Sequence, residues 1–207
     1  MNKIIVAISR QFGSGGRIIG ERLAAELGIL FYDKTIIELA AKKSGLSTDF
    51  IEKSEEHASN SFLFNLASSS YTAPSYMFHY DLPIADKAFF AQASVIKELA
   101  AKDSCVIVGR CADYILRNEP NCIKVFVHAN MEDRKKRIEN IYKISADEVE
   151  SKINKIDKGR ANYYRHYTSE KWGDIFNHDL AINTSIVGIN GAVRVIKAML
   201  KEGKYIN

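Results

Sequence analysis

Residues that could carry chemistry gather first in a glycine-rich stretch near the start of the chain, Gly13-Ser14-Gly15-Gly16. Its three glycines lack a Cβ, so the backbone can adopt positive φ angles and its N–H groups can approach a ligand closely. An apolar, β-branched run precedes the stretch, and a helical pattern begins at Arg17. A buried strand, a glycine loop and a helix N-terminus together make an anion site. We expect a nucleotide phosphate there, and a plain tight turn is the alternative.

The loop departs from the usual phosphate-binding motif, G-x-x-x-x-G-K-[ST]. If Gly16 is the second glycine of that motif, Gln11 replaces the first glycine and Arg17 replaces the lysine. Ile18 then stands where a hydroxyl group usually binds Mg²⁺. Arg17 still offers a positive charge, now as a planar fork that can bind two oxygens.

Polar residues also follow two later apolar segments. Asp33 comes after Leu30-Phe31-Tyr32, and Arg110 comes after the run Cys105–Val108 and one glycine. In open α/β sheets, ligands bind at the carboxyl ends of the strands, so both residues are candidates for the site of the glycine loop. The alternatives are a helix N-cap for Asp33 and a structural ion pair with Asp113 for Arg110.

Basic residues are frequent between 134 and 165. Arg134 and Arg137 share a face of one predicted helix, and a later helix carries Asp157 and Arg160 on one side and Arg165 on another. Such clusters are usually solvated faces. Here they follow several strand–helix units that already indicate a phosphate site, which favours a mobile basic lid.

Composition narrows the class of protein. The chain has 207 residues, 46% of them hydrophobic, which suffices for one domain with a full core. Its net charge of +4 fits polyphosphate ligands and does not require nucleic acid. The three cysteines form no C-x-x-C pair, and neither a signal peptide nor a membrane-spanning run is present. We therefore expect a soluble, reduced, cytoplasmic protein with neither a nucleic-acid partner nor a membrane attachment.

Apolar strands alternate with helices along the chain, which predicts an α/β fold with a parallel, doubly wound sheet. Between residues 44 and 80 the periodicity weakens and aromatic residues become frequent, as in Tyr76-Met77-Phe78-His79-Tyr80. This segment is interpreted as a helical insertion over a cleft. Its aromatic residues either stack on a base or anchor the insertion to the core.

Taken together, these segments resemble the cytidylate-kinase-like branch of the P-loop nucleoside monophosphate kinases over nearly the whole chain. The resemblance rests on SRQFGSGGRIIG at 9–20, FYDK at 31–34, VIVGRCADYIL at 106–116, KVFVHA at 124–129, EDRKKR at 132–137, IDKGRANYYRHY at 156–167 and DLAINTS at 179–185. It implies a three-layer P-loop kinase fold in a single domain. The core would span about 1–43, 96–135 and 172–207, with an acceptor-side insertion at about 44–95 and a lid at about 136–171.

The resemblance also implies roles for individual residues. The donor nucleotide would lie on Gly13, Ser14, Gly15, Gly16, Arg17 and Ile18, and the acceptor on Asp33 and Arg110. Arg17, Arg134, Arg160 and Arg165 would neutralise charge on the transferring phosphoryl group. Mg²⁺ would be held mainly by nucleotide phosphates and water, with Ser14 or Asp33 in the outer shell.

The implied reaction moves the γ-phosphoryl group of ATP, or another NTP, to a nucleoside monophosphate, with a pyrimidine such as CMP favoured. The chain departs from true cytidylate kinases at Arg17, Ile18 and Val108, and the residues that read cytosine have no clear match. A catalytically silent nucleotide-binding protein and a P-loop kinase for a different small acceptor therefore remain alternatives. A small basic nucleic-acid binder is a third, although it would leave the glycine loop unexplained. The sequence does not indicate an oligomeric state.

Overall fold

The computed structural model describes residues 3–52, 83–142 and 146–206 of the chain. The predicted aromatic segment, including Tyr76 to Tyr80, lies outside the described residues.

Strands and helices alternate through the described chain. In order they are β1 (Ile5–Arg10), α1 (Gly16–Leu27), β2 (Leu30–Tyr32), α2 (Thr35–Ser44), α4 (Ile84–Lys102), β3 (Cys105–Val108), α5 (Ala112–Ile115), β4 (Cys122–His128), α6 (Met131–Tyr142), α7 (Ala146–Thr168), the 3-10 turn η1 (Ile175–Asn177), β5 (Leu180–Asn183) and α8 (Thr184–Glu202).

The five strands form one parallel sheet in the order β2-β3-β1-β4-β5. β1 lies in the middle, with Ile8 beside Val108 of β3 and beside Val125 of β4. Parallel strands with helical crossovers are covered on both faces, which explains their continuous apolar sequences. The predicted α/β fold with a parallel sheet is confirmed.

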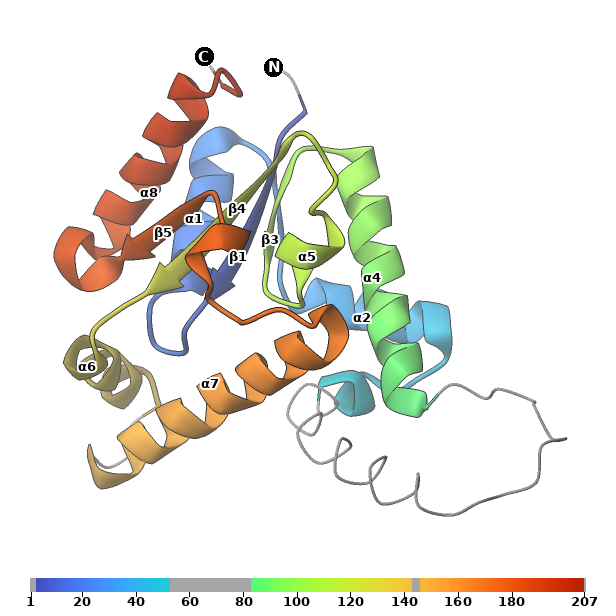
Figure 1. The fold of residues 1–207 in the computed structure, drawn as a ribbon, viewed down its shortest axis with the longest axis horizontal. Coiled ribbons are helices and arrows are strands. Elements are labelled where there is room, and N and C mark those ends of the chain that lie inside the picture. Colours follow the sequence, from blue (N-terminus) through green and yellow to red (C-terminus); the bar gives the residue numbers. More distant parts are fainter. Residues whose placement is uncertain (1–2, 53–82, 143–145, 207) are drawn as a thin grey trace, which may run out of the picture.

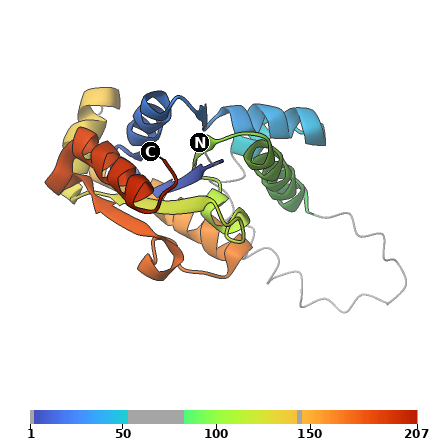
Figure 2. The same cartoon turned by 90° about the horizontal axis from the view of Figure 1, so that it is seen from above.

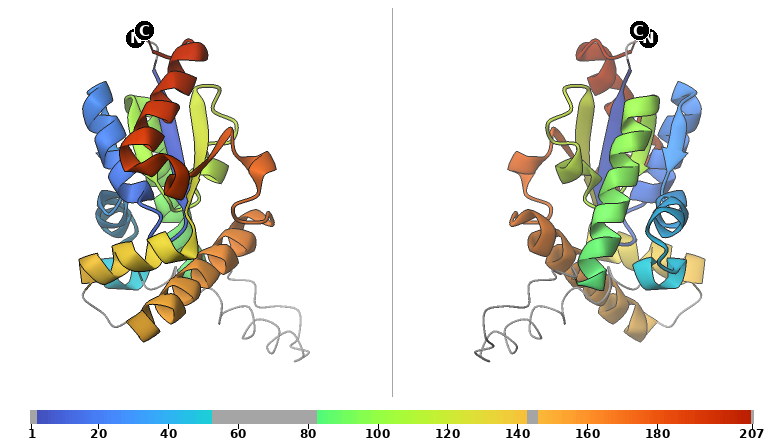
Figure 3. Two further views of the ribbon diagram at one scale, coloured as in Figure 1. Left: turned by 90° about the vertical axis from the view of Figure 1, so that its left-hand side faces the viewer. Right: turned by 90° about the vertical axis from the view of Figure 1, so that its right-hand side faces the viewer.

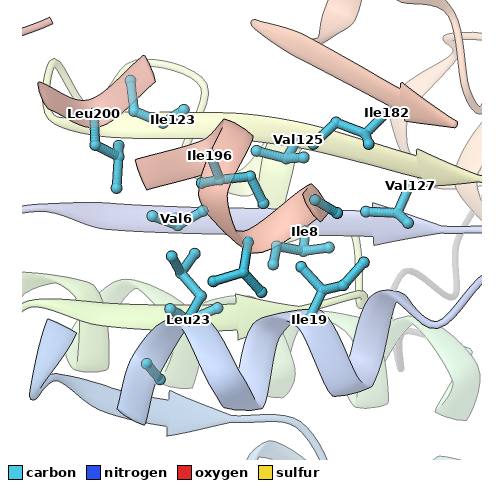
Figure 4. Close-up of a cluster of buried hydrophobic side chains, with 14 of the residues drawn as sticks. Val6, Ile8, Ile19, Leu23, Ile123, Val125, Val127, Ile182, Ile196 and Leu200 are labelled. Atoms are coloured by element: carbon cyan, nitrogen blue, oxygen red, sulfur yellow. The ribbon is translucent and has the colours of Figure 1, made fainter. Parts of the chain in front are cut away.

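Alternate residues of each strand face opposite layers. Val6 and Ile8 of β1 pack with Ile19 of α1 and Ile196 of α8, as the close-up in Figure 4 shows. The intervening residues Ile5 and Ala7 belong to a second cluster with side chains of α2, α4 and α5. Figures 2 and 3 show helices on both sides of the strands, with α8 over one face and α4 over the other. The fold is therefore a three-layer sandwich.

Helix α4 crosses the boundary at residues 95–96 that the sequence suggested between insertion and core. Ala88 and Ile96 of this one helix belong to the same buried cluster. In the described structure, the buried core thus extends to residues of α4 before residue 95, while Phe89 of the same half stacks on Tyr167 of α7. The N-terminal half of α4 therefore belongs to the core in addition to the acceptor-side segment that the sequence suggested.

One local expectation differs from the structure. Lys34, not Asp33, occupies the N-cap of α2, and it makes no side-chain capping bond. The last helix, α8, begins at Thr184 with a short first turn, which joins the rest of the helix through Gly188, whose φ of 67° breaks the helical geometry. Asn183 caps this first turn by accepting from the backbone N–H of Ser185 at 3.0 Å.

Helices α6 and α7 lie across the end of the sheet toward which the strand arrows point in Figure 1. The carboxyl ends of parallel strands meet at one edge, so the segments that follow β1 and β3 open toward these two helices. The candidate site is at this edge.

Candidate phosphate-binding site

The glycine loop connects the end of β1 at Arg10 to the start of α1 at Gly16. Gly15 occupies the N-cap of α1 with φ 86° and ψ 5°, a left-handed conformation that side chains with a Cβ rarely adopt. A Cβ at Gly15 would also lie only 2.2 Å from Cδ1 of Ile189 on α8. Glycine is thus required at this point, both for the turn and for the packing of α8.

Side chains from outside the loop bind its carbonyl groups. Thr184 Oγ1 donates to the carbonyl of Ser14 at 2.8 Å, Arg134 Nε donates to that of Phe12 at 2.7 Å, and Arg137 donates to that of Gly13. Among the described residues, none accepts a hydrogen bond from the backbone N–H of Gly15, Gly16 or Arg17. The loop therefore presents donors at the N-terminus of α1, the arrangement that binds anions.

An ion pair between α6 and α7 holds the loop at Phe12. Asp157 Oδ1 accepts from the Phe12 backbone N–H at 2.7 Å, and the other carboxylate oxygen pairs with Arg134. Arg134 is only 5% exposed at its side chain. Of the four predicted catalytic arginines, Arg134 thus lies against the loop backbone, where it positions the loop.

Three guanidinium groups lie close together beside the loop. They belong to Arg10 at the end of β1, Arg110 after β3, and Arg160 on α7. A cavity of about 50 Å³ is lined by Ser9, Arg10, Gly109, Arg110, Cys111, Arg160, Tyr163, Tyr164 and Trp172. Arg110 and Arg160, to which the resemblance gave an acceptor-binding role and a charge-neutralising role, both line this cavity, and Arg10 is an addition that the sequence analysis missed.

The electrostatics of this cluster are those of an anion site. The pKa of Arg110 is lowered to about 10 and that of Arg160 to about 9. Burial is the main cause in both cases, and repulsion from Arg10 is the second. Arg160 Nη1 donates to the Arg10 carbonyl at 3.0 Å, and Arg110 Nη1 donates to Oε1 of the buried Gln92 at 3.0 Å. The expected alternative for Arg110, an ion pair with Asp113, is wrong, because Asp113 lies 3.2 Å from Nε2 of His178.

Gly109 provides the space for Arg10. A Cβ built on Gly109 would lie 2.1 Å from Nη1 of Arg10, and the residue has a φ of 82°. One sequence signal could have indicated Arg10. It is a charged residue at the very end of a buried strand, and the neighbouring parallel strand ends in Gly-Arg. Each feature alone is common.

The remaining predicted residues lie around this centre. Arg17 Nε pairs with Asp33 Oδ2 at 2.8 Å, and the Arg17 side chain is 63% exposed. Ile18 is half-buried in the first turn of α1, and Arg165 is exposed on α7. The donor-side Arg17 and the acceptor-side Asp33 are therefore brought together as a pair, whereas Arg165 is separate from the buried cluster.

Residues 5–186 match the sequence model of the cytidylate kinase-like family. The chain belongs to that family. Among curated proteins, none matches it.

Solved structures place this cytidylate kinase-like chain among P-loop kinase folds. An uncharacterized protein from Eubacterium ventriosum is 26% identical, with a TM-score of 0.73 over 96% of this chain and 99% of that one. Shikimate kinases from Acinetobacter baumannii, in complex with shikimate, and from Bacteroides thetaiotaomicron are 15% and 13% identical. The TM-scores are 0.53 for the first kinase and 0.54 for the second. The first match covers 98% of this chain and 96% of the kinase chain, and the second covers 96% and 98%. Family and fold support a kinase-type phosphotransferase.

Kinases of this family use magnesium with the nucleotide, so the oxygen donors near the loop matter. No group of three or more His, Cys, Asp or Glu side chains within the described ranges could hold a metal ion. Asp33 and Ser14 supply oxygens at the loop, although Asp33 pairs with Arg17 and the Ser14 hydroxyl donates to the Gln11 carbonyl at 2.8 Å. These residues fit the outer shell of a magnesium ion whose direct ligands are phosphate oxygens and water.

In the described part of the chain, no helix has both the length and the apolarity to cross a bilayer.

Proposed function

We propose that this protein transfers the γ-phosphoryl group of ATP, or another NTP, to a nucleoside monophosphate, with CMP as the first acceptor to test. The observation that carries the proposal is the convergence of two anion sites at one sheet edge. The N–H groups at the start of α1 form one site, and the guanidinium groups after β1 and β3 and on α7 form the other. A reaction between two phosphates needs such a pair.

Phosphoryl transfer requires little covalent chemistry from the protein, because rate enhancement comes from in-line positioning and charge neutralisation. In our proposal Gly13 to Gly16 bind the donor phosphates and Arg110 binds the acceptor phosphate. Arg160 is the member of the second site that also approaches the loop, with its guanidinium carbon 5.7 Å from the centre of the Phe12 ring, and it neutralises the transferring group. Magnesium supplies further charge neutralisation when it arrives with the nucleotide.

Arg17 has a conditional role. It pairs with Asp33, and its exposed guanidinium can turn to a donor phosphate when one binds. Arg165 would contribute only after α7 moves toward the donor. We retain the lid at about 136–171 as the moving part of the enzyme, and the insertion at about 44–95 as its acceptor-side segment.

Two other functions are tested by the same experiments. A silent nucleotide-binding protein is favoured by the absence of a loop lysine and by the Arg17–Asp33 pair. A kinase for a small carboxylate acceptor is suggested by the fold it shares with shikimate kinases. A nucleic-acid binder is less well supported, because Arg134 and Arg160 are engaged with the loop and do not form an exposed basic stripe.

The decisive assay measures nucleoside diphosphate release from ATP with a panel of acceptors: CMP, dCMP, UMP, AMP, GMP and shikimate. We expect turnover with at least one monophosphate and none with shikimate. Turnover with shikimate and with none of the monophosphates would show that the acceptor is not a nucleoside monophosphate. Binding of ATP without turnover on any acceptor would establish the silent binder. The salt dependence of oligonucleotide binding tests the third function, which predicts a steep slope.

A further inference from the structure

Arg10 is the one residue of the arginine cluster that the family resemblance did not assign. It is the last residue of β1, the central strand, and its guanidinium lies over Gly109 of the neighbouring strand end. Among the described residues, none forms a hydrogen bond or ion pair with that guanidinium; only its backbone carbonyl is bound, by Arg160. The side chain faces the 50 Å³ cavity.

The nearby carboxylates are already engaged by other cations. Asp33 pairs with Arg17, Asp157 with Arg134, and Asp113 with His178. These acids act on Arg10 only at longer range, and burial lowers the Arg10 pKa in spite of them. Buried charges in folded proteins are normally paired. The cavity therefore holds an excess of positive charge that a bound anion would balance.

We propose that Arg10 is a substrate-binding residue that, with Arg110 and Arg160, holds one dianionic phosphomonoester group, that of the acceptor. The inference rests on the proposed function. Three guanidinium groups match a dianion better than they match a single carboxylate charge, and each can offer two donors to a tetrahedral group. The cavity has room for one small group, and Tyr163, Tyr164 and Trp172 close its sides.

The position of Arg10 makes it a determinant of specificity for the charge of the acceptor. It extends from the central strand of the sheet, whereas Arg160 extends from α7, and its guanidinium occupies the space that a side chain on Gly109 would fill. A lysine at position 10 would keep one charge but lose the planar fork. An acceptor with a neutral group at this point would leave the Arg10 guanidinium without the counter-charge that a phosphate supplies.

Arg10→Gln and Arg10→Lys would be compared with the wild type by calorimetric titration of CMP, inorganic phosphate and a non-hydrolysable ATP analogue. Loss of one partner of a buried charge pair weakens binding by at least about 30-fold. We expect that loss for CMP and phosphate in Arg10→Gln, a smaller loss in Arg10→Lys, and less than a threefold change for the ATP analogue. Arg117→Gln is the control, since Arg117 is exposed and stacks on the Tyr114 ring at 3.9 Å.

Thermal unfolding distinguishes binding from a structural role. If Arg10 serves ligand binding, Arg10→Gln removes an uncompensated charge. The Tm measured without ligand then stays the same or rises, while the increase in Tm that CMP causes becomes smaller. A lower Tm with unchanged CMP affinity would overturn the proposal. Turnover with unchanged KM for the monophosphate in Arg10→Gln would overturn it while leaving the kinase function intact. Arg10-dependent CMP binding without turnover would support it and remove the kinase function.

Discussion

The ion pair between Arg134 and Asp157 is the contact on which we expect the loop to depend most. Asp157→Ala would leave the Arg134 guanidinium, 5% exposed at its side chain, without a counter-charge, and the Phe12 N–H without its acceptor. Removing one partner of a buried pair costs about 3–5 kcal/mol. For a domain of this size, Tm should fall by about 6–20 °C.

Urea denaturation of Asp157→Ala, Arg134→Met and the double variant would measure the coupling. Replacing both members of a buried ion pair by apolar groups is often nearly neutral. We expect the double variant to be more stable than the sum of the single losses predicts, by at least about 1 kcal/mol. Some loss should remain, because the backbone N–H and carbonyl groups of Phe12 then lose their bonds to these two side chains.

A matched control exists on the same two helices. Lys135 of α6 pairs with Glu150 of α7 at 2.8 Å, and the Glu150 side chain is 50% exposed. Exposed pairs contribute about 0–1 kcal/mol, so Lys135→Met should change stability little. If Asp157→Ala behaves like Lys135→Met, or if the two single losses simply add, the ion pair does not hold the loop.

Three further predictions concern the site and its surroundings. Gly109→Ala should displace the Arg10 guanidinium, since the new Cβ would lie 2.1 Å from Nη1, and calorimetry should show the CMP affinity falling as in Arg10→Gln. Arg17→Met should lower kcat by on the order of 10²-fold in the coupled assay, with Tm unchanged because the side chain is exposed; full kcat would show that Arg17 does not contact the phosphates. Burial alone would lower the pKa of His178, but its bonds to Asp113 and to the Asp174 carbonyl outweigh burial and raise it. The stability that protonated His178 contributes is therefore complete below about pH 6.5 and is lost as pH rises through the raised pKa. Over this pH window, the Tm of the wild type should fall more than the Tm of His178→Gln. Equal slopes of Tm against pH would contradict this.

The parallel sheet and the glycine loop were predictable because both depend on local sequence. A continuous β-branched run such as Ile4 to Ile8 has few alternatives to a buried strand, and a glycine cluster directly before a helix has a specific backbone geometry. The position of Arg110 at the same sheet edge as the glycine loop followed from one further assumption, that β1 and β3 are parallel.

Other features depend on contacts between distant segments and were missed. Nothing near Asp157 indicates that its carboxylate binds an N–H group 145 residues earlier. Asp113 appeared to be a partner for Arg110, three residues before it, yet the turn after β3 directs Asp113 to His178. Arg10 was overlooked because its importance comes from Gly109, at the end of the neighbouring strand. Periodicity within one strand does not contain that information.

Helix α7 contributes to several tasks within about two turns. Asp157 holds the loop, Arg160 reaches the cavity, and Tyr163 and Tyr164 form the cavity wall. Consequently, a chimaera that takes this helix from a relative would exchange the acceptor wall and the support of the donor loop in one step. Substrate preference in such hybrids should change together with thermal stability, and swapping single wall residues should separate the two properties.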